Sequence, residues 1–113
     1  MLERAGFAVT TANDGAEALA RLADASFDVV VIDLEMSWVN GYELLDALRR
    51  RPEARAVPVI VLTTRAGEKH ASLARQLGAR HYVTKPVEEH AFVRLVVSTL
   101  AARRDHDVGA AAP

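Results

Sequence analysis

The stretch Phe27–Gly41, FDVVVIDLEMSWVNG, decides the fold. Its first part, from Phe27 to Ile32, is a run of mostly β-branched apolar residues that only Asp28 interrupts. A run this short and this apolar predicts a strand buried on both faces, as in the middle of a parallel sheet. Asp33 follows at the strand's carboxyl end, where open α/β sheets bind their ligands. Asp33 is therefore a candidate site residue, and a carboxylate that merely ends the strand or caps a turn is the simpler alternative.

The composition is that of an ordinary globular domain. The chain has 113 residues, 50% of them hydrophobic and 26% charged, which suits one domain. It has no cysteine, so disulfides and thiol chemistry are excluded. The net charge of −1 provides no global attraction to nucleic acid or to an anionic membrane. We expect no membrane span and no signal peptide, which makes the cytoplasm the expected location. Four scattered histidines do not predict a metal site.

Along the chain, hydrophobic periodicity predicts strands alternating with helices, and hence a parallel sheet built from βαβ units. Met1–Gly6 resembles the last turn of a helix, with Gly6 as its C-cap. Asp105–Pro113 is small and polar, which predicts a domain over residues 1–104 followed by a flexible tail or linker at 105–113. We expect strands at Phe7–Ala12, Phe27–Ile32, Val57–Leu62 and His81–Val83, and helices at Ala16–Ala25, Gly41–Arg50, Gly67–Leu77 and Glu88–Arg104.

One run of positive charge, Arg49–Arg51, closes the second of these helices. Positive charge at a helix C-terminus interacts favourably with the helix dipole, so a solvated helix end is the simpler interpretation. A nucleic-acid patch is the alternative, and no aromatic residue is interleaved with the run to support it.

Polar side chains follow three of the predicted strands, namely Asp33, Thr63 with Thr64, and Lys85. The carboxyl ends of parallel strands share one edge of the sheet, so an acid, a hydroxyl and an ammonium are expected to meet there. Such a set could form an aspartyl phosphate on Asp33, with Lys85 and Thr63 donating to the phosphoryl oxygens. The alternative is that Lys85 simply forms an ion pair with Asp33.

With these residues in place, the sequence resembles a receiver domain of a two-component response regulator over about residues 1 to 102. The spacing of Asp33, Thr63 and Lys85 matches that family without a gap. More weakly, Arg65–His70 resembles the corresponding segment of receivers fused to chemotaxis-type hybrid histidine kinases. The segments that carry the resemblance are Asp33–Met36, Asn40–Leu45, Val59–Thr63 and Gly78–Pro86.

The resemblance implies a flavodoxin-like, doubly wound parallel α/β sheet with helices on both faces. It implies that Asp33 accepts phosphate from a histidine kinase or phosphotransfer protein, and that Asp33 and the backbone carbonyl of Glu35 bind Mg²⁺. Thr63 would follow the phosphoryl group, Lys85 would bind it, and Tyr82 would change rotamer as a two-state switch. The last helix and strands would contact a downstream protein, with no direct nucleic-acid or membrane partner. No enzymatic activity is expected beyond self-phosphorylation and autodephosphorylation.

The sequence also departs from the family. The family's first strand and the acidic pair that ends it would lie ahead of Met1, which leaves four predicted strands and a poor ligand set for Mg²⁺. A misplaced start or a fragment is the favoured explanation over a deliberate four-stranded receiver, with Phe7–Ala12 closing onto the Phe27 strand as a third option. Ser37 stands where the family usually has proline, and Trp38 lies in the loop beside Asp33.

Two other functions remain open from the sequence. The chain could be a receiver-like protein-binding module or fragment that is not phosphorylated because the acidic pair is missing. It could also be an enzyme of the haloacid dehalogenase type, which shares the Asp, Thr and Lys but normally has an aspartate where Glu35 stands.

Overall fold

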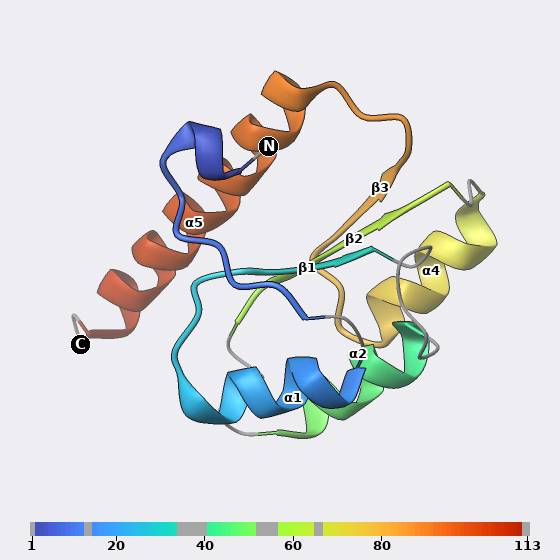
Figure 1. The fold of residues 1–113 in the computed structure, drawn as a ribbon, viewed down its shortest axis with the longest axis horizontal. Coiled ribbons are helices and arrows are strands. Elements are labelled where there is room, and N and C mark those ends of the chain that lie inside the picture. Colours follow the sequence, from blue (N-terminus) through green and yellow to red (C-terminus); the bar gives the residue numbers. More distant parts are fainter. Residues whose placement is uncertain (1, 13–14, 34–40, 52–56, 65–66, 112–113) are drawn as a thin grey trace. The chain divides into compact units, whose positions relative to one another are not determined.

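The structure, a computed structural model, describes residues 2–12, 15–33, 41–51, 57–64 and 67–111, and for 103–111 it describes the backbone alone. The chain divides into two compact units (Figure 1). One comprises Met1–Val9 with Val87–Pro113, and the other comprises Thr10–Pro86. The sheet and all the strand-end residues considered above belong to the second unit.

The sheet consists of three parallel strands in the described residues: β1 (Val30–Asp33), β2 (Val59–Thr63) and β3 (His81–Thr84). Their order is β1-β2-β3, so β2 is central, and all five of its residues are buried. Its sequence, VIVLT, is β-branched at four of five positions, which suits a strand packed on both faces. This confirms the predicted parallel α/β sheet.

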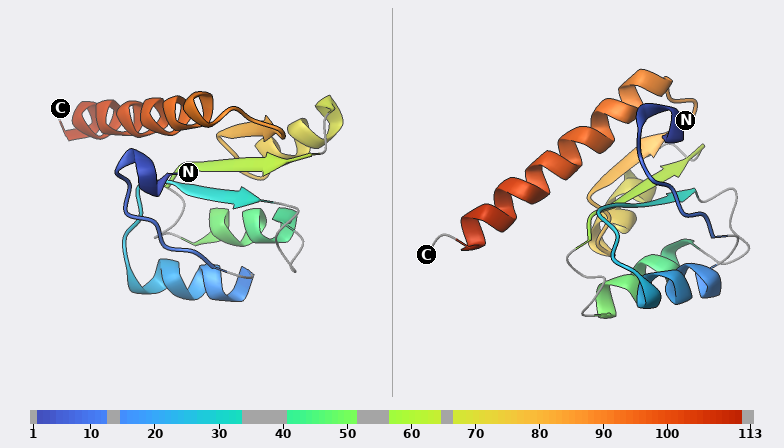
Figure 2. Two further views of the ribbon diagram at one scale, coloured as in Figure 1. Left: turned by 45° about the horizontal axis from the view of Figure 1, so that its top comes forward. Right: turned by 60° about the vertical axis from the view of Figure 1, so that its left-hand side comes forward.

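Three helices belong to the same unit: α1 (Gly15–Asp24), α2 (Gly41–Arg50) and α4 (Glu68–Gln76). Both views of Figure 2 show α1 and α2 on the same side of the β1–β2 pair. The bounds of α2 are those predicted from its periodicity. Gly78, with φ of 107°, reverses the chain after α4, where a residue with a Cβ would be strained.

One core cluster holds this unit together. In-register positions of parallel strands point to the same face, and Ile32 pairs with Val61 in this way. Leu45 of α2, only 1% exposed, and Ala74 of α4 pack with them, while Leu19 of α1 lies at the margin of the cluster. The buried members of the cluster are Ile32, Leu44, Leu45, Leu48, Val59, Val61, Ala74 and Ala79.

The other unit contains a short 3₁₀ helix, η1 (Glu3–Ala5), and the long helix α5 (Glu89–Ala111). Arg4 and Glu89 join them through an ion pair of 3.1 Å. Phe92, Val96 and Thr99 are buried at the helical spacing that the sequence predicts for an inner face. None of the helices in the described residues is long and apolar enough to cross a membrane.

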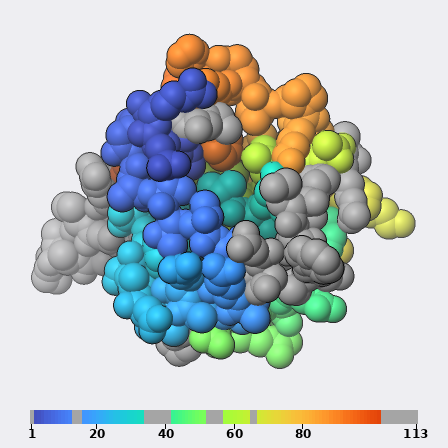
Figure 3. Space-filling model, viewed as in Figure 1, coloured from blue at the N-terminus to red at the C-terminus, as the bar shows by residue number. Residues whose placement is uncertain are grey.

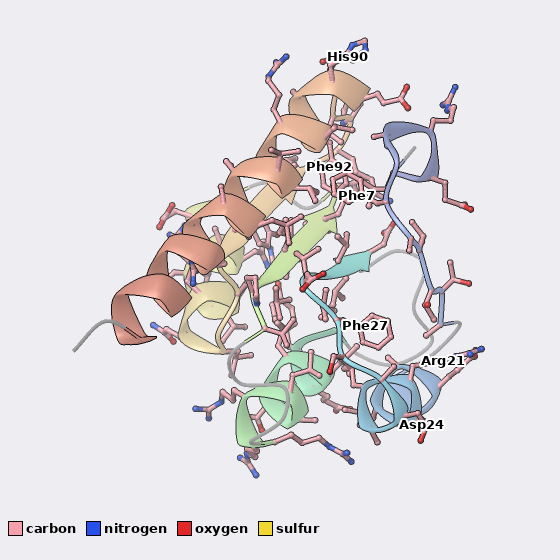
Figure 4. The ribbon with its side chains drawn as sticks, turned by 90° about the vertical axis from the view of Figure 1, so that its left-hand side faces the viewer. Phe7, Arg21, Asp24, Phe27, His90 and Phe92 are labelled. Atoms are coloured by element: carbon pink, nitrogen blue, oxygen red, sulfur yellow. The ribbon has the colours of Figure 1, made fainter. Side chains whose placement is uncertain are left out.

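Glu88 caps the N-terminus of α5. Its Oε1 accepts the backbone N–H of His90 at 3.0 Å, and its Oε2 accepts that of Ala91 at 2.8 Å. These two bonds satisfy donors that a helix start leaves without intrahelical partners, and they lower the pKa of the Glu88 carboxyl. His90 points outward from this turn (Figure 4).

The predicted end of the last helix differs from the structure. The backbone of α5 is helical to Ala111, past Arg104, where the sequence predicts a tail to begin. The weak helix formers Asp105, Asp107 and Gly109 are the reason why the sequence predicts an earlier end. The division into a domain at 1–104 and a tail at 105–113 therefore stays a prediction.

The predicted strand at Phe7–Ala12 is wrong, because these residues have no regular secondary structure and pair with no described strand. The sheet therefore has three strands in the described residues, and not four. A β-rich sequence forms a strand only when a neighbouring strand takes up its hydrogen bonds. Residues 8–12 are exposed, Val9 at 41%, and this segment lies on the surface among the dark blue atoms of Figure 3.

Candidate functional site

The register of the sheet brings the predicted site residues to one edge. Asp33, the last residue of β1, pairs with Leu62, the residue before Thr63. Thr63, the last residue of β2, pairs with Thr84, the residue before Lys85. The three predicted side chains therefore end three adjacent parallel strands, which is where open α/β sheets place their sites.

Asp33 and Lys85 form an ion pair at this edge. The Nζ of Lys85 donates to Oδ1 of Asp33 at 2.8 Å and to Oδ2 at 2.7 Å. Each side chain is 27% exposed, so the pair is shielded from water more than a surface salt bridge but is reachable from solvent. In this state the ammonium neutralises the carboxylate, as the ion-pair alternative predicted.

Thr63 contributes to the placement of Lys85 through its main chain. The carbonyl oxygen of Thr63 accepts the backbone N–H of Lys85 at 2.7 Å, which fixes the start of the lysine side chain beside β2. Thr63 itself is completely buried, whereas Thr64 is exposed. Sequence patterning could not reveal this link, because it depends on the register of β2 and β3.

Tyr82 lies in β3, paired with Val61, and is partly buried against the core cluster. It is three residues before Lys85, on the face of the sheet that packs on α2 and α4. Tyr82 thus lies between the site edge and the core, where a change of its rotamer would alter the packing of its neighbours. The rotamer change itself stays a prediction.

Glu35, whose backbone carbonyl is expected to bind Mg²⁺, lies outside the described residues, as do Ser37 and Trp38 of the same loop. Among the residues that are described, no three His, Asp or Glu side chains cluster as a metal site would require. The carboxylate of Asp33 is engaged by an ammonium, and Mg²⁺ needs several oxygen ligands in octahedral geometry. The described residues therefore do not form a Mg²⁺ site by themselves.

The open parallel sheet, with an acid and a lysine paired at its carboxyl edge, defines an α/β domain of the doubly wound class. Residues 1–97 match the family of the response regulator receiver domain, and the chain belongs to this family. It is therefore a receiver domain of the kind found in two-component signalling, as the sequence resemblance indicated.

Curated relatives agree with this assignment. The chain is 35% identical over 101 residues to protein PilH of Pseudomonas aeruginosa, covering 89% of this chain and 84% of PilH. It is 39% identical over 106 residues to the transcriptional regulatory protein CpxR of Escherichia coli, covering 94% of this chain and 43% of CpxR. The chain thus spans less than half of CpxR.

Solved structures show the same fold. The chemotaxis protein CheY4 of Vibrio cholerae superposes with a TM-score of 0.80 at 31% identity, covering 87% of this chain and 82% of that one. A CheY-like receiver domain protein of Methanospirillum hungatei superposes with a TM-score of 0.83 at 23% identity, over 93% and 82% of the two chains. At that identity the second likeness concerns the fold alone.

Proposed function

We propose that this receiver domain accepts a phosphoryl group on Asp33 from the phosphohistidine of a histidine kinase or phosphotransfer protein. The observation that carries the proposal is the contact of Lys85 Nζ with both carboxylate oxygens of Asp33 at the carboxyl edge of the sheet. This contact places a cation within reach of any group that becomes attached to either oxygen.

In the proposed step, one carboxylate oxygen of Asp33 attacks the phosphorus of the donor. A P–O bond forms, the P–N bond to the imidazole breaks, and its electron pair stays on the imidazole nitrogen. The product is an acyl phosphate. Transfer removes the negative charge from one of the two Asp33 oxygens that Lys85 contacts, and the phosphoryl oxygens become new partners for its ammonium. The same ammonium can therefore stabilise the site before and after transfer.

Thr63 and Tyr82 are proposed to change their contacts when Asp33 is phosphorylated. The Thr63 hydroxyl would donate to a phosphoryl oxygen, and Tyr82 would change rotamer against the core cluster. Because β3 contacts α4, such a change would alter the surface of these two elements for a protein partner. The proposed location is the cytoplasm, without direct binding to nucleic acid or membrane. If Mg²⁺ takes part, ligands beyond the described residues must supply most of its coordination.

The test is the intact mass of the chain after incubation with acetyl phosphate, with and without Mg²⁺. We expect one phosphoryl group on the wild type and none on Asp33→Asn. Asp28→Asn is the matched control, because Asp28 is another acid of the same segment but precedes β1 and should not affect labelling.

Labelling that persists in Asp33→Asn would show that another group is the acceptor. An unlabelled wild type, under conditions that label a comparison receiver, would favour the receiver-like protein-binding module that is not phosphorylated. A second test uses a phosphorylated histidine kinase domain as the donor. Labelling by this domain but not by acetyl phosphate would mean that acetyl phosphate is a poor donor, whereas no labelling by either would mean that the site cannot be phosphorylated.

A further inference from the structure

A group of arginines lies at the amino end of the sheet, opposite to the Asp33–Lys85 edge. Two of them are in the last turn of α2, one is in the last turn of α4, and one directly precedes β3. We call this group the arginine surface. Its members are Arg49, Arg50, Arg75 and Arg80.

Contacts around Gly78 show that three of these residues converge. A Cβ on Gly78 would lie 3.7 Å from the Cβ of Arg49, so the end of α2 touches the turn after α4. The N–H of Gly78 donates to the carbonyl of Arg75 at 3.0 Å. Arg80 is two residues further along, so its Cα is within about 7 Å of that of Gly78. The backbones of three segments, each of which carries an arginine, therefore meet in one small area.

The arginine surface is exposed and only partly neutralised. The side chains of Arg49, Arg50 and Arg75 are 50%, 71% and 50% exposed. Asp46 alone accepts both Arg49 at 2.8 Å and Arg50 at 3.0 Å.

Arg75 pairs with Glu68. Arg80 is also exposed, and it forms no ion pair with any side chain in the described part of the chain. Among the described residues, these four positive charges thus share the carboxylates of Asp46 and Glu68.

Helix dipoles explain only part of this arrangement. An arginine in the last turn of a helix stabilises that turn, which accounts for Arg49, Arg50 and Arg75 taken separately. Arg80 lies beyond the last turn of α4, where the effect of the helix dipole has fallen off. The convergence of three segments on one area is likewise no consequence of helix capping.

We propose that the arginine surface binds an acidic segment of a partner protein. Guanidinium groups here already pair with carboxylates in the structure, two of them on the single group of Asp46. An incoming Asp or Glu side chain would meet Arg80 directly and could share Arg49 and Arg50, through the planar fork that suits carboxylates.

Nucleic acid fits this surface less well. Proteins that bind it through phosphates commonly make six to ten such contacts, and this surface offers four cations. The overall net charge of −1 adds no long-range attraction to a polyanion. A short acidic peptide needs only a few cations, and its charge is opposite to that of the arginine surface.

The experiment measures binding of a fluorescent peptide of about ten Asp and Glu residues by anisotropy at low ionic strength. The test variant is Arg49→Gln with Arg80→Gln, since glutamine keeps the Cβ and Cγ of arginine. The control is Arg21→Gln with Arg94→Gln, which removes the same charge from two exposed arginines elsewhere. Arg21 points outward from α1 in Figure 4.

We expect saturable binding that weakens about tenfold in the test variant and less than about twofold in the control. Equal weakening in both variants, or no saturable binding by the wild type, would overturn the proposal. So would tighter binding of a DNA duplex of matched charge with the same dependence on Arg49 and Arg80. If the test variant does not fold by circular dichroism, Arg50→Gln with Arg75→Gln replaces it under the same expectations.

Discussion

Lys85 places its ammonium within 2.8 Å of both carboxylate oxygens of Asp33, a residue 52 positions earlier in the chain. A single cation that bridges both oxygens leaves neither one as an uncompensated charge in a site that is only 27% exposed. Removal of either partner would therefore leave the other as a partly buried, unpaired charge.

The first prediction concerns the strength of this pair. In a double-mutant cycle with Asp33→Asn and Lys85→Gln, the coupling free energy should be about 1–2 kcal/mol, because both groups are partly desolvated and hydrogen-bonded. Urea unfolding of the four proteins measures it. The exposed Glu17–Arg21 pair on α1, at 3.2 Å, is the control and should couple by about 0.5 kcal/mol or less. Equal coupling in the two cycles would contradict the prediction.

The second prediction concerns the core cluster. Leu45→Ala should lower the free energy of unfolding by about 2–5 kcal/mol, since Leu45 is 1% exposed and its truncation leaves a cavity between α2 and the sheet. Leu73→Ala on α4 is the matched control, because Leu73 is 42% exposed. Its cost should stay below about 1 kcal/mol. A large loss in both variants would mean that Leu73 is covered in solution.

The third prediction concerns acid unfolding. Hydrogen bonds from the backbone of His90 and Ala91 lower the pKa of Glu88, so its folded-state pKa lies below that of the unfolded chain. Its contribution to stability is therefore present at neutral pH and is lost as the pH falls through the folded-state pKa.

Glu88→Gln should flatten the decline of the thermal midpoint between pH 6 and about pH 3. Glu3→Gln, which removes the same charge from an exposed residue of the same unit, serves as the control. If the thermal midpoints of both variants decline with falling pH as that of the wild type does, the cap makes no contribution to this pH dependence.

The fourth prediction links His81 to its neighbour in the arginine surface. Partial burial, and to a lesser degree the charge of Arg80, lower the pKa of the His81 imidazole. Arg80→Gln should raise this pKa, which should nevertheless stay below the ordinary histidine range because the burial remains. An NMR titration of the His81 ring protons measures it. Arg94→Gln is the control, and an equal rise of the His81 pKa in this variant would rule out a local effect of Arg80.

The site edge could be anticipated from the sequence because it depends on strand ends alone. Asp33 and Lys85 each follow an apolar run, and parallel topology brings such ends together. The residue pattern could not decide between a phosphoryl-binding lysine and an ion pair. The structure shows the ion pair, and the phosphoryl-binding role stays a prediction that the mass measurement tests.

The error at Phe7–Ala12 has a different origin. Its alternation and β-branched residues describe what the segment prefers locally, but strand formation depends on a partner that lies elsewhere in the chain or outside it. Helix α2, whose repeating backbone hydrogen bonds join residues four apart in the same segment, was predicted with its bounds correct. Local patterns thus determine helices more completely than strands.

The register of the sheet also determines how long the side chain at position 85 has to be. Asp33 is level with Leu62 and Val83, so the backbone of Lys85 lies two residues further along the strand direction, about 6.6 Å, and two strand spacings to the side, about 9.6 Å, with β2 between them. The four-carbon stem of lysine has to reach back toward Asp33 to contact both oxygens. A shorter cationic side chain here would keep the charge and lose the contact, so chain length is as much a requirement at this position as positive charge.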